Sequence, residues 1–278
     1  MELKSPNQNF SYFVSENLNI KNNSDWIGFN PGSITGCIVW MDFNTSGGVI
    51  HDNISNTAGS CFSGVDWVSG RKGSGVAFTG SAYIRVYDNT QIGSNDNYSI
   101  SFWINNCSGS SDQSVSEHWV SGGGYPWAIR GPYSTSNGRI TFSLYAGYAG
   151  VGNPSVSSLK DMRSGLHHCV CVRDWINSGS FSFYVDGSLS QIAKDTTDGD
   201  VSSSGTGFSI GARFQTTALR FFNGQIDEFS VYNRALTELE IQQLYNFGYP
   251  KFKTLSSENE TTTINNLNSN NLIIKEVN

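Results

Sequence analysis

Residues 224–250, GQIDEFSVYNRALTELEIQQLYNFGYP, carry a strand signal followed by a helix signal, and this pair decides the fold class. The first part, IDEFSVY (226–232), alternates as a half-buried strand does, which puts Asp227 on the same face as Phe229 and Val231. A carboxylate on a core face needs a partner, because burying an unpaired charge is costly. What holds Asp227 is therefore the first question that the sequence raises about function.

The second part of this segment predicts a short helix that starts after Thr237. Thr237 is the expected N-cap and Glu240 completes a capping box, while Gly248 stands where the helix should end. Ile241 and Leu244 form part of an apolar stripe at helical spacing. We therefore expect one helix that packs against a sheet.

Runs of alternating apolar residues recur along the rest of the chain, separated by turns rich in Gly, Ser and Asn. Each run is typical of a half-buried antiparallel strand, and helical periodicity between the runs is almost absent. The sequence therefore predicts an all-β fold, an antiparallel two-sheet β-sandwich or jelly roll with one short C-terminal helix. The runs are 37–43, 75–80, 83–88, 99–105, 138–147, 167–174, 180–190, 208–214 and 226–232.

Composition narrows the class of protein further. Of 278 residues, 37% are hydrophobic and only 14% charged, with 30 glycines, as in a packed, loop-rich fold with a Ser, Asn and Thr surface. The net charge of −6 argues against nucleic acid as a partner. The sequence shows neither an apolar run long enough to cross a bilayer nor a secretory leader, so we expect no membrane insertion. The five cysteines are expected to be reduced thiols, as after synthesis in a cytoplasm.

The two ends of the chain differ from its body. Residues 1–34 form a polar N-terminal arm, 35–250 the expected jelly-roll domain, and 251–278 a polar C-terminal tail rich in asparagine. On composition the tail should be disordered. The alternative is that its last residues, NNLIIKEVN (270–278), are held by a partner as an added strand.

The order of several motifs resembles the laminin-G-like, concanavalin A-like jelly-roll domains, over about residues 35–247. The motifs are GVAFTGSAYIRVYDN (75–89), YSISFWIN (98–105), GLHHCVCVRDWINSGSFSFYVDGSLS (165–190), FSIGARF (208–214) and FFNGQIDEFSVYNRALTELEIQQLYN (221–246). The resemblance implies the fold. It does not imply one function, because this fold hosts lectins, pentraxin-like binders, adhesion modules and glycoside hydrolases.

The resemblance also implies a metal site. Several members of such families bind structural Ca²⁺ with an acidic residue of the IDE strand and a loop near the first strand, which here implies Asp227, Asp52 and Asn56, with Asp42 less favoured. The loop sequence DNISN (52–56) departs from the family pattern, because it lacks the glycine of the turn. The alternative is that Asp227 accepts hydrogen bonds from backbone amides or pairs with Arg234.

An active site is not expected. Hydrolases on such sandwiches use two carboxylates spaced two apart on one strand. The comparable pair here, Glu238 and Glu240, falls in the first turn of the predicted helix, where it favours the helix dipole and capping. The acidic cluster Asp195, Asp198 and Asp200 falls in a turn and is interpreted as a solvated loop. We therefore expect a protein that is not an enzyme.

The segment SGGGYPWAIRGPYSTSNGR (121–139) is the candidate binding loop. It gathers Tyr125, Trp127, Arg130 and Tyr133 among glycines, and aromatic faces beside amides and hydroxyls suit glycans or protein interfaces. The alternative is that Trp127 and Tyr133 pack under their own loops.

Two functions are compatible with these observations. The first is a structural or interaction protein, a surface or decoration subunit of a virion-like assembly, made in a cytoplasm and docked to protein partners by the arms 1–34 and 251–278. The second is a carbohydrate-binding, lectin-like module of a surface or secreted protein. The first predicts that deleting 251–278 abolishes assembly, and the second predicts that glycan binding survives the deletion.

Overall fold

The structure is a computed structural model. It describes residues 29–45, 49–55, 58–87, 92, 96–108, 112–119, 124–132, 137–145, 153–197, 207–214 and 217–247, and the backbone of 261–268 and 271–277. The chain divides into two units, residues 31–245 and the terminal segments 1–30 with 246–278. Most of the predicted N-terminal arm, residues 1–28, therefore lies outside the described residues, as do residues 248–260 of the C-terminal part.

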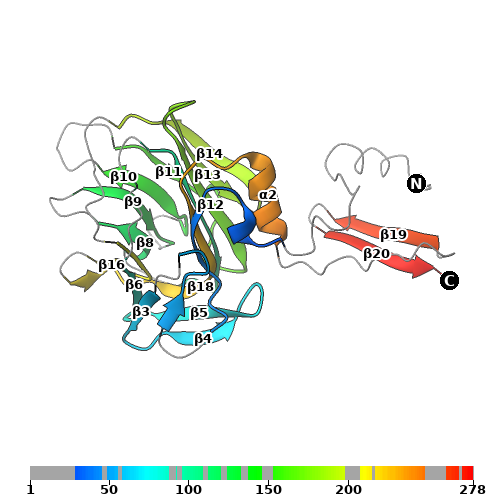
Figure 1. Ribbon diagram of the computed structural model, residues 1–278, viewed down its shortest axis with the longest axis horizontal. Helices are drawn as coiled ribbons and strands as arrows, with labels where there is room; N and C mark the ends of the chain where they lie inside the picture. The colour runs from blue at the N-terminus through cyan, green and yellow to red at the C-terminus, as the bar shows by residue number, and fades with distance from the viewer. Residues whose placement is uncertain are drawn as a thin grey trace. The chain divides into compact units, whose positions relative to one another are not determined.

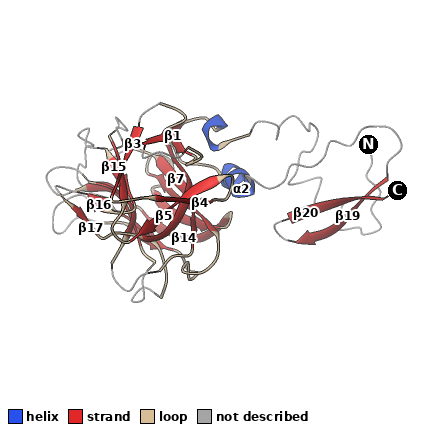
Figure 2. Ribbon diagram, turned by 90° about the horizontal axis from the view of Figure 1, so that it is seen from below, coloured by secondary structure: helices blue, strands red, loops and turns tan. Residues whose placement is uncertain are grey.

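The larger unit is a sandwich of two antiparallel sheets that lie face to face (Figures 1 and 2). Sheet A has the order β14-β13-β12-β7-β18-β5-β4, and β1 also pairs with β18. Its strands are β1 (Cys37–Met41), β4 (Asp66–Ser69), β5 (Ser74–Thr79), β7 (Tyr98–Asn105), β12 (His167–Asp174), β13 (Ser180–Val185), β14 (Ser188–Lys194) and β18 (Asn223–Tyr232).

Sheet B has the order β11-β10-β9-β8-β15-β6-β3-β2. Its strands are β2 (Val49–His51), β3 (Ala58–Phe62), β6 (Tyr83–Val86), β8 (Ser114–His118), β9 (Tyr125–Arg130), β10 (Thr141–Tyr145), β11 (Ser155–Ser157) and β15 (Phe208–Ile210). A small hairpin joins β16 (Arg213–Phe214) to β17 (Ala218–Leu219), and a 3-10 turn, η1, spans Pro31–Ser33. The predicted all-β sandwich with one short helix is confirmed.

In the terminal unit, β19 (Thr261–Asn268) and β20 (Asn271–Val277) pair antiparallel as a hairpin. The composition of this segment did not predict it.

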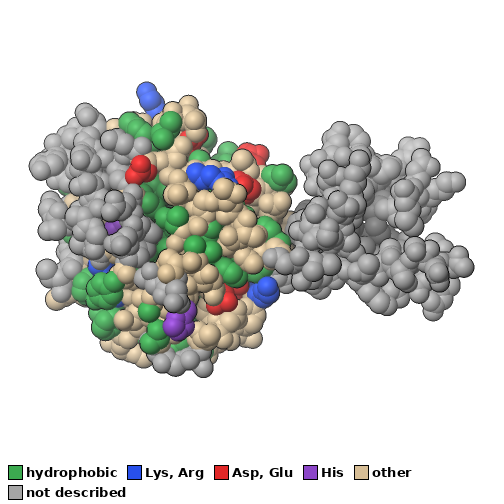
Figure 3. Space-filling view, in the orientation of Figure 1, with side chains coloured by type: hydrophobic (Ala, Val, Ile, Leu, Met, Phe, Trp, Pro, Cys, Tyr) green, Lys and Arg blue, Asp and Glu red, His purple; other side chains and the backbone are tan. Residues whose placement is uncertain are grey.

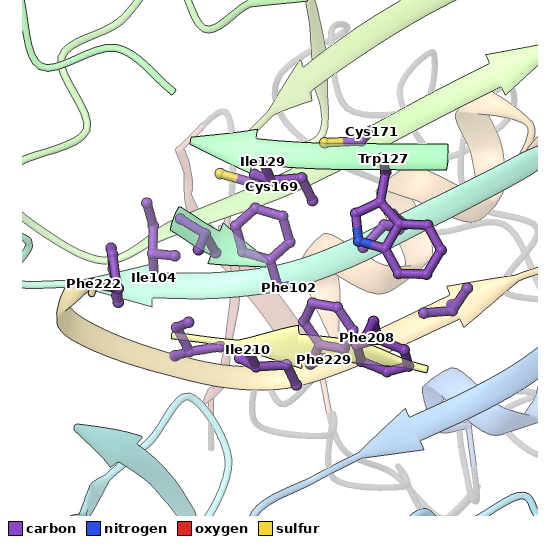
Figure 4. Close-up of a cluster of buried hydrophobic side chains, with 14 of the residues drawn as sticks. Phe102, Ile104, Trp127, Ile129, Cys169, Cys171, Phe208, Ile210, Phe222 and Phe229 are labelled. Carbon is purple, nitrogen blue, oxygen red and sulfur yellow. The ribbon is translucent and has the colours of Figure 1, made fainter. Parts of the chain in front are cut away.

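The core fills the space between the sheets. Figure 4 shows Phe102, Cys169 and Phe229 of sheet A facing Trp127 and Phe208 of sheet B. The ring of Phe142 stacks on that of Phe181 with centroids 4.0 Å apart, which joins the two sheets at β10 and β13. All five cysteines are free thiols, as expected. Where Figure 3 shows described residues, uncharged polar side chains and backbone cover more of the surface than charged side chains do, in agreement with the composition.

The prediction that Asp227 shares a face with Phe229 is wrong, because β18 contains a β-bulge. The register with β7 shifts between Asp227 and Ser230, and Glu228 takes a positive φ of 50°. The extra residue changes the alternation, so that Ile226 and Phe229 both pack in the core although they are three positions apart. Asp227, next to Ile226, consequently lies on the outer side of sheet A.

The predicted helix is confirmed as α2, Glu238–Asn246. The Thr237 hydroxyl accepts a hydrogen bond from the Glu240 amide at 3.3 Å, and Glu240 Oε2 accepts one from the Thr237 amide at 2.9 Å, which is the reciprocal capping box. Arg234, a suggested partner of Asp227, instead forms an ion pair with Glu240. Its bonds to Glu240 are the main reason that the pKa of that carboxyl falls to about 2.

Asp195 is not in a solvated loop. Its side chain is fully buried and forms an ion pair with Arg173 of β12 at 2.6 Å, while its other oxygen accepts a hydrogen bond from the Thr197 amide. A buried carboxylate requires such partners, and spacing in the sequence could not reveal an arginine on another strand. Asp198 and Asp200 lie outside the described residues.

Candidate functional site

The segment predicted as a binding loop contains a central strand of sheet B. Residues 125–130 form β9, between β8 and β10. Four consecutive residues of β9, from Pro126 to Ile129, are buried, so the strand shows none of the alternation that would have marked it in the sequence. Its candidate residues are therefore held by a rigid sheet, which suits a preformed site. Tyr133 lies outside the described residues.

Trp127 belongs to the core, which is the alternative that the sequence left open. It has no exposed surface, and its ring lies 5.5 Å from that of Phe208 and 4.7 Å from that of His118. Its indole nitrogen donates to Ser116 Oγ at 3.2 Å. Trp127 therefore supports the sheet from within and does not meet a ligand.

Tyr125 and Arg130 lie on the opposite, outer face of β9. Ile129 packs in the core, so its neighbour Arg130 points outward, and a register shift against β10 returns Tyr125 to the same outer face opposite Tyr145. The guanidinium carbon of Arg130 lies 5.0 Å from the centroid of the Tyr125 ring. The Tyr125 ring stacks on Tyr145 at 5.3 Å and lies 5.4 Å from Trp119. These residues form a continuous aromatic surface beside a fixed cation.

A buried carboxylate organises the centre of this face. Glu117 of β8 has no exposed side-chain surface, and its Oε1 accepts a bond of 2.8 Å from Arg130 Nε. Arg213 lies 3.6 Å from Glu117 Oε2, and its guanidinium carbon lies 3.8 Å from the centroid of Trp119. Ser114 Oγ also donates to Glu117. The two arginines are therefore held in fixed orientations by a group that a ligand does not reach.

The aromatic surface continues across β6. Ile84 and Val86 pack in the core, so Tyr83 and Arg85 face outward, and Arg85 shares its face with Glu117 because both are opposite Ser209. The guanidinium carbon of Arg85 lies 4.7 Å from the centroid of Phe214, whose ring is 5.8 Å from that of Tyr83. We call this outer surface of sheet B the arginine face. It comprises Tyr83, Arg85, Glu117, Trp119, Tyr125, Arg130, Tyr145, Arg213 and Phe214.

Sequence reasoning found Tyr125 and Arg130 but missed most of the arginine face. The segment YIRVYD (83–88) carried a usable signal, because Tyr83 and Arg85 alternate with the apolar Ile84 and Val86. Arg213 and Glu117 lie on other segments and offered no comparable signal. The tertiary fold, which no single segment reveals, brings Arg213 of β16 and Glu117 of β8 together.

A second notable group surrounds the bulge of β18. Asp227 is 4% exposed and accepts hydrogen bonds from the amides of Arg71 at 2.6 Å, Lys72 at 3.4 Å and Glu228 at 2.8 Å. A Cβ on Gly70 would lie 2.4 Å from Asp227 Oδ2, so this loop can approach only because residue 70 is glycine. Burial is the main reason that the pKa of Asp227 is raised to about 7.

Glu228 is buried beside Asp227. Its Oε2 accepts a bond from the indole of Trp40 at 2.7 Å, whereas its Oε1 has no hydrogen-bond donor among the described residues. Burial, followed by the charges of Asp227 and Asp42, raises the pKa of Glu228 to about 8. The bulge therefore holds two adjacent acidic groups that ionise with difficulty.

The Asp52 carboxylate stabilises the loop that contains it by accepting hydrogen bonds. Its Oδ1 accepts bonds from the amides of Trp40 at 2.7 Å and Ile54 at 3.0 Å, and its Oδ2 accepts from the amide and hydroxyl of Ser55. These four bonds use most of the acceptor capacity of one carboxylate. Asn56, the third predicted ligand, lies outside the described residues. The calcium site thus stays a prediction.

Two further features of the described ranges bear on metal and membrane chemistry. Among those residues, no cluster of three or more His, Cys, Asp or Glu side chains could hold a metal ion. None of the helices described there is both long and apolar enough to span a bilayer.

Comparison with known proteins places this chain in a family. The profile of the concanavalin A-like lectin/glucanases superfamily matches residues 78–242. No curated protein sequence matches the chain.

Solved structures share the fold at low sequence identity. Domain 4 of AbnA, an extracellular arabinanase from Geobacillus stearothermophilus, in complex with arabinotriose, has a TM-score of 0.59 and 17% identity, over 75% of this chain and 98% of that chain. The binding domain of Paraclostridial Mosquitocidal Protein 1 has a TM-score of 0.60 and 15% identity, over 76% of this chain and 52% of that one. The binding domain of Botulinum Neurotoxin DC in complex with SialylT has a TM-score of 0.59 and 16% identity, over 77% and 52%.

The chain thus spans about half of the toxin binding domains that it resembles. The two-sheet topology and the family match over more than half of the sequence agree, and the chain belongs to the concanavalin A-like lectin/glucanases superfamily.

Proposed function

We propose that the jelly roll is a non-catalytic binding module that recognises glycans with the arginine face of sheet B. The observation that carries this proposal is the row of rings formed by Tyr145, Tyr125 and Trp119 beside the fixed guanidiniums of Arg130 and Arg213. Aromatic faces supply apolar surface for the C–H faces of a sugar, and guanidinium N–H groups donate to its oxygens. A rigid sheet presents both kinds of group.

The structural neighbours support a binding role over a scaffolding role. Domain 4 of AbnA is recorded with arabinotriose, and the binding domain of Botulinum Neurotoxin DC with SialylT and, in another structure, with rat synaptotagmin II. Two of these three ligands are sugars. These neighbours support the proposal that the protein acts at an extracellular or cell surface, where glycans are displayed.

The test is a glycan array followed by isothermal titration of the best ligand. Tyr125→Ala should weaken glycan binding by about tenfold or more, because it removes one stacking surface and loosens Arg130. Tyr184→Ala is the matched control, since Tyr184 is a half-buried tyrosine of β13 in the other sheet. Equal affinities of the wild type and the Tyr125 variant, or an array without any bound glycan, would contradict the proposal.

The C-terminal hairpin favours a second candidate function, attachment to protein partners in a larger assembly such as a virion surface. An isolated two-stranded hairpin is marginally stable in water, and its edges can accept a further strand. The register pairs Ile264 with Ile274 and Leu267 with Leu272 across the hairpin. A hairpin of this kind can dock to a partner through its strand edges.

Light scattering after size-exclusion chromatography tests this second candidate. The full chain should form an oligomer or bind the protein partners of its assembly. A chain that ends at residue 250 should do neither. Monomers of both lengths that bind glycan equally well would remove the assembly function and leave the glycan function intact.

We retain structural Ca²⁺ as a proposal, centred on Asp227. The acceptor capacity of Asp52 is largely used by its own loop, whereas Glu228 Oε1 is buried and without a donor among the described residues. Asp42 is close enough for its charge to raise the pKa of both acidic residues of the bulge. Hard carboxylate oxygens are the ligands that Ca²⁺ prefers. Asp227 and Glu228 would offer carboxylate oxygens to the ion, with backbone oxygens and water as the remaining ligands, and the ion would stabilise the bulge.

A further inference from the structure

Resting on the glycan-binding function proposed above, we infer that the arginine face selects acidic glycans, whose sugars carry a carboxylate or sulfate group. The inference concerns the charge of this face, which differs from that of the whole protein. The chain has a formal net charge of −6.

The described residues of this face have the opposite sign. Arg85, Arg130 and Arg213 lie around the single carboxylate of Glu117. At its margin, Arg220 forms an ion pair with Asp112, and that pair adds no net charge. Three positive charges less one negative charge give the arginine face a local charge of +2. A local excess of this kind attracts anions even to an acidic protein.

Aromatic rings hold all three arginines in place, although Arg85 is only 4% exposed and contributes charge without meeting a ligand. Arg213 lies 3.8 Å from the centroid of Trp119, Arg130 5.0 Å from that of Tyr125, and the Arg85 guanidinium 4.7 Å from that of Phe214. A guanidinium packed against a ring keeps its N–H groups in a fixed plane, and a rigid fork of donors fits a carboxylate or sulfate.

Glu117 fixes the two central arginines without neutralising both. It binds Arg130 through Nε at 2.8 Å and Nη2 at 3.3 Å, and it lies 3.6 Å from Arg213 Nε. One carboxylate thus positions two cations. The side chains of Arg130 and Arg213 remain 19% and 15% exposed, so a ligand that lies on the face can reach them.

A neutral sugar would stack on the aromatic rings and accept guanidinium hydrogen bonds only with uncharged oxygens. An acidic sugar would place its ring on Tyr125 and Tyr145, whose rings stack at 5.3 Å, and its charged group toward Arg213 and Arg130. Hydrogen bonds between charged partners contribute more than neutral ones, so the acidic ligand should bind more tightly by about tenfold or more.

The test uses an array in which each acidic glycan stands beside its neutral counterpart, prepared by removing the sialic acid or sulfate group or by reducing the uronate carboxyl. The full chain is expected to bind acidic members at least about tenfold more tightly than their counterparts, with an affinity that falls as salt rises. Arg213→Gln should abolish the preference, and Arg213→Lys should restore it only in part, because lysine keeps the charge but not the fork. Arg163→Gln, at an exposed arginine paired with Asp161, is the matched control.

The outcomes separate this inference from the proposed function. Equal binding of acidic and neutral glycans would overturn the inference and leave the glycan function standing, whereas an array without any bound glycan would overturn both. If the Arg213 variants fail to fold, the wild-type chain still tests the inference. Its relative affinities for acidic and neutral glycans, and their salt dependence, show whether it prefers acidic ligands.

Discussion

Replacing Glu228 with glutamine is expected to remove most of the pH dependence of stability between about pH 6 and pH 9. Glu228 is 2% exposed and lies beside Asp227 in the β18 bulge. Burial, followed by the charge of Asp227, raises the pKa of its carboxyl from 4.5 to about 8. The native state therefore holds this proton more tightly than the unfolded chain does. The stabilisation by this proton is fully present below the pKa of Glu228 in the unfolded chain. It is lost as the pH rises through the pKa of Glu228 in the folded protein.

The size of the effect follows from the same pKa. About two pH units separate pH 6 from the folded value near 8, and each unit corresponds to about 1.4 kcal/mol. The free energy of unfolding should therefore fall by about 2.7 kcal/mol between pH 6 and pH 9 through Glu228. Asp227, with a pKa raised to about 7, acts in the same direction. Because the two groups titrate together, the sum of their separate effects is an upper limit.

Urea unfolding at a series of pH values, with a chelator present, measures this effect. Wild type should lose stability toward alkaline pH, and Glu228→Gln should lose much less. Glu238→Gln is the control, because Glu238 is an exposed glutamate at the start of α2. A wild-type free energy that is flat or rises over this range would refute the reasoning, as would a glutamine variant with the wild-type slope. Added Ca²⁺ should restore alkaline stability to wild type but not to the variant if the proposed ion binds here.

Three further substitutions test the fold by urea unfolding at neutral pH. Trp127→Ala should cost about 3–5 kcal/mol, because it empties a site with no exposed surface, and a loss below about 1 kcal/mol would contradict its core position. Asp195→Asn should cost about 3 kcal/mol or more, since it leaves the buried Arg173 without its charged partner, and near-neutral stability would contradict that ion pair. Thr237→Ala should cost about 1 kcal/mol through loss of the N-cap, whereas Thr237→Ser should be nearly silent.

The sequence predicts the parts of this fold that follow from local pattern. Strands such as Tyr98–Asn105 and Ser180–Val185 alternate, and the capping box marks the start of α2. The bulge at Glu228 escaped prediction, because one extra residue can be recognised only against the partner strand. The β9 strand escaped for another reason: its outer face carries the small Ala128 between buried neighbours, so polar and apolar positions do not alternate.

The candidate site was predicted only in part, because local pattern reveals the residues of one segment but not the strands that pair with it. Tyr125 and Arg130 stand five positions apart in one segment, so a concentration of aromatic and basic residues was visible there. Arg85 reaches the face from β6, and the pairing of β15 with both β6 and β8 relates it to Glu117. Arg213 of β16 is related to Glu117 by proximity, since its Nε lies 3.6 Å from Glu117 Oε2. Binding faces of sheets are non-local, so a single segment reveals only one strand of such a face.

The position of α2 explains why the proposed binding face lies on sheet B and not on sheet A. The outer face of sheet A is occupied where Trp103 stacks against Tyr245 of this helix at 5.7 Å, and His168 lies beneath them with its ring 5.0 Å from Trp103. Burial lowers the pKa of His168 to about 3, as expected of a ring kept from water. No described helix packs against the arginine face of sheet B, so its rings and guanidiniums keep part of their surface for a ligand. The helix signal in residues 237–248 therefore bears on function, because it determines which sheet is covered.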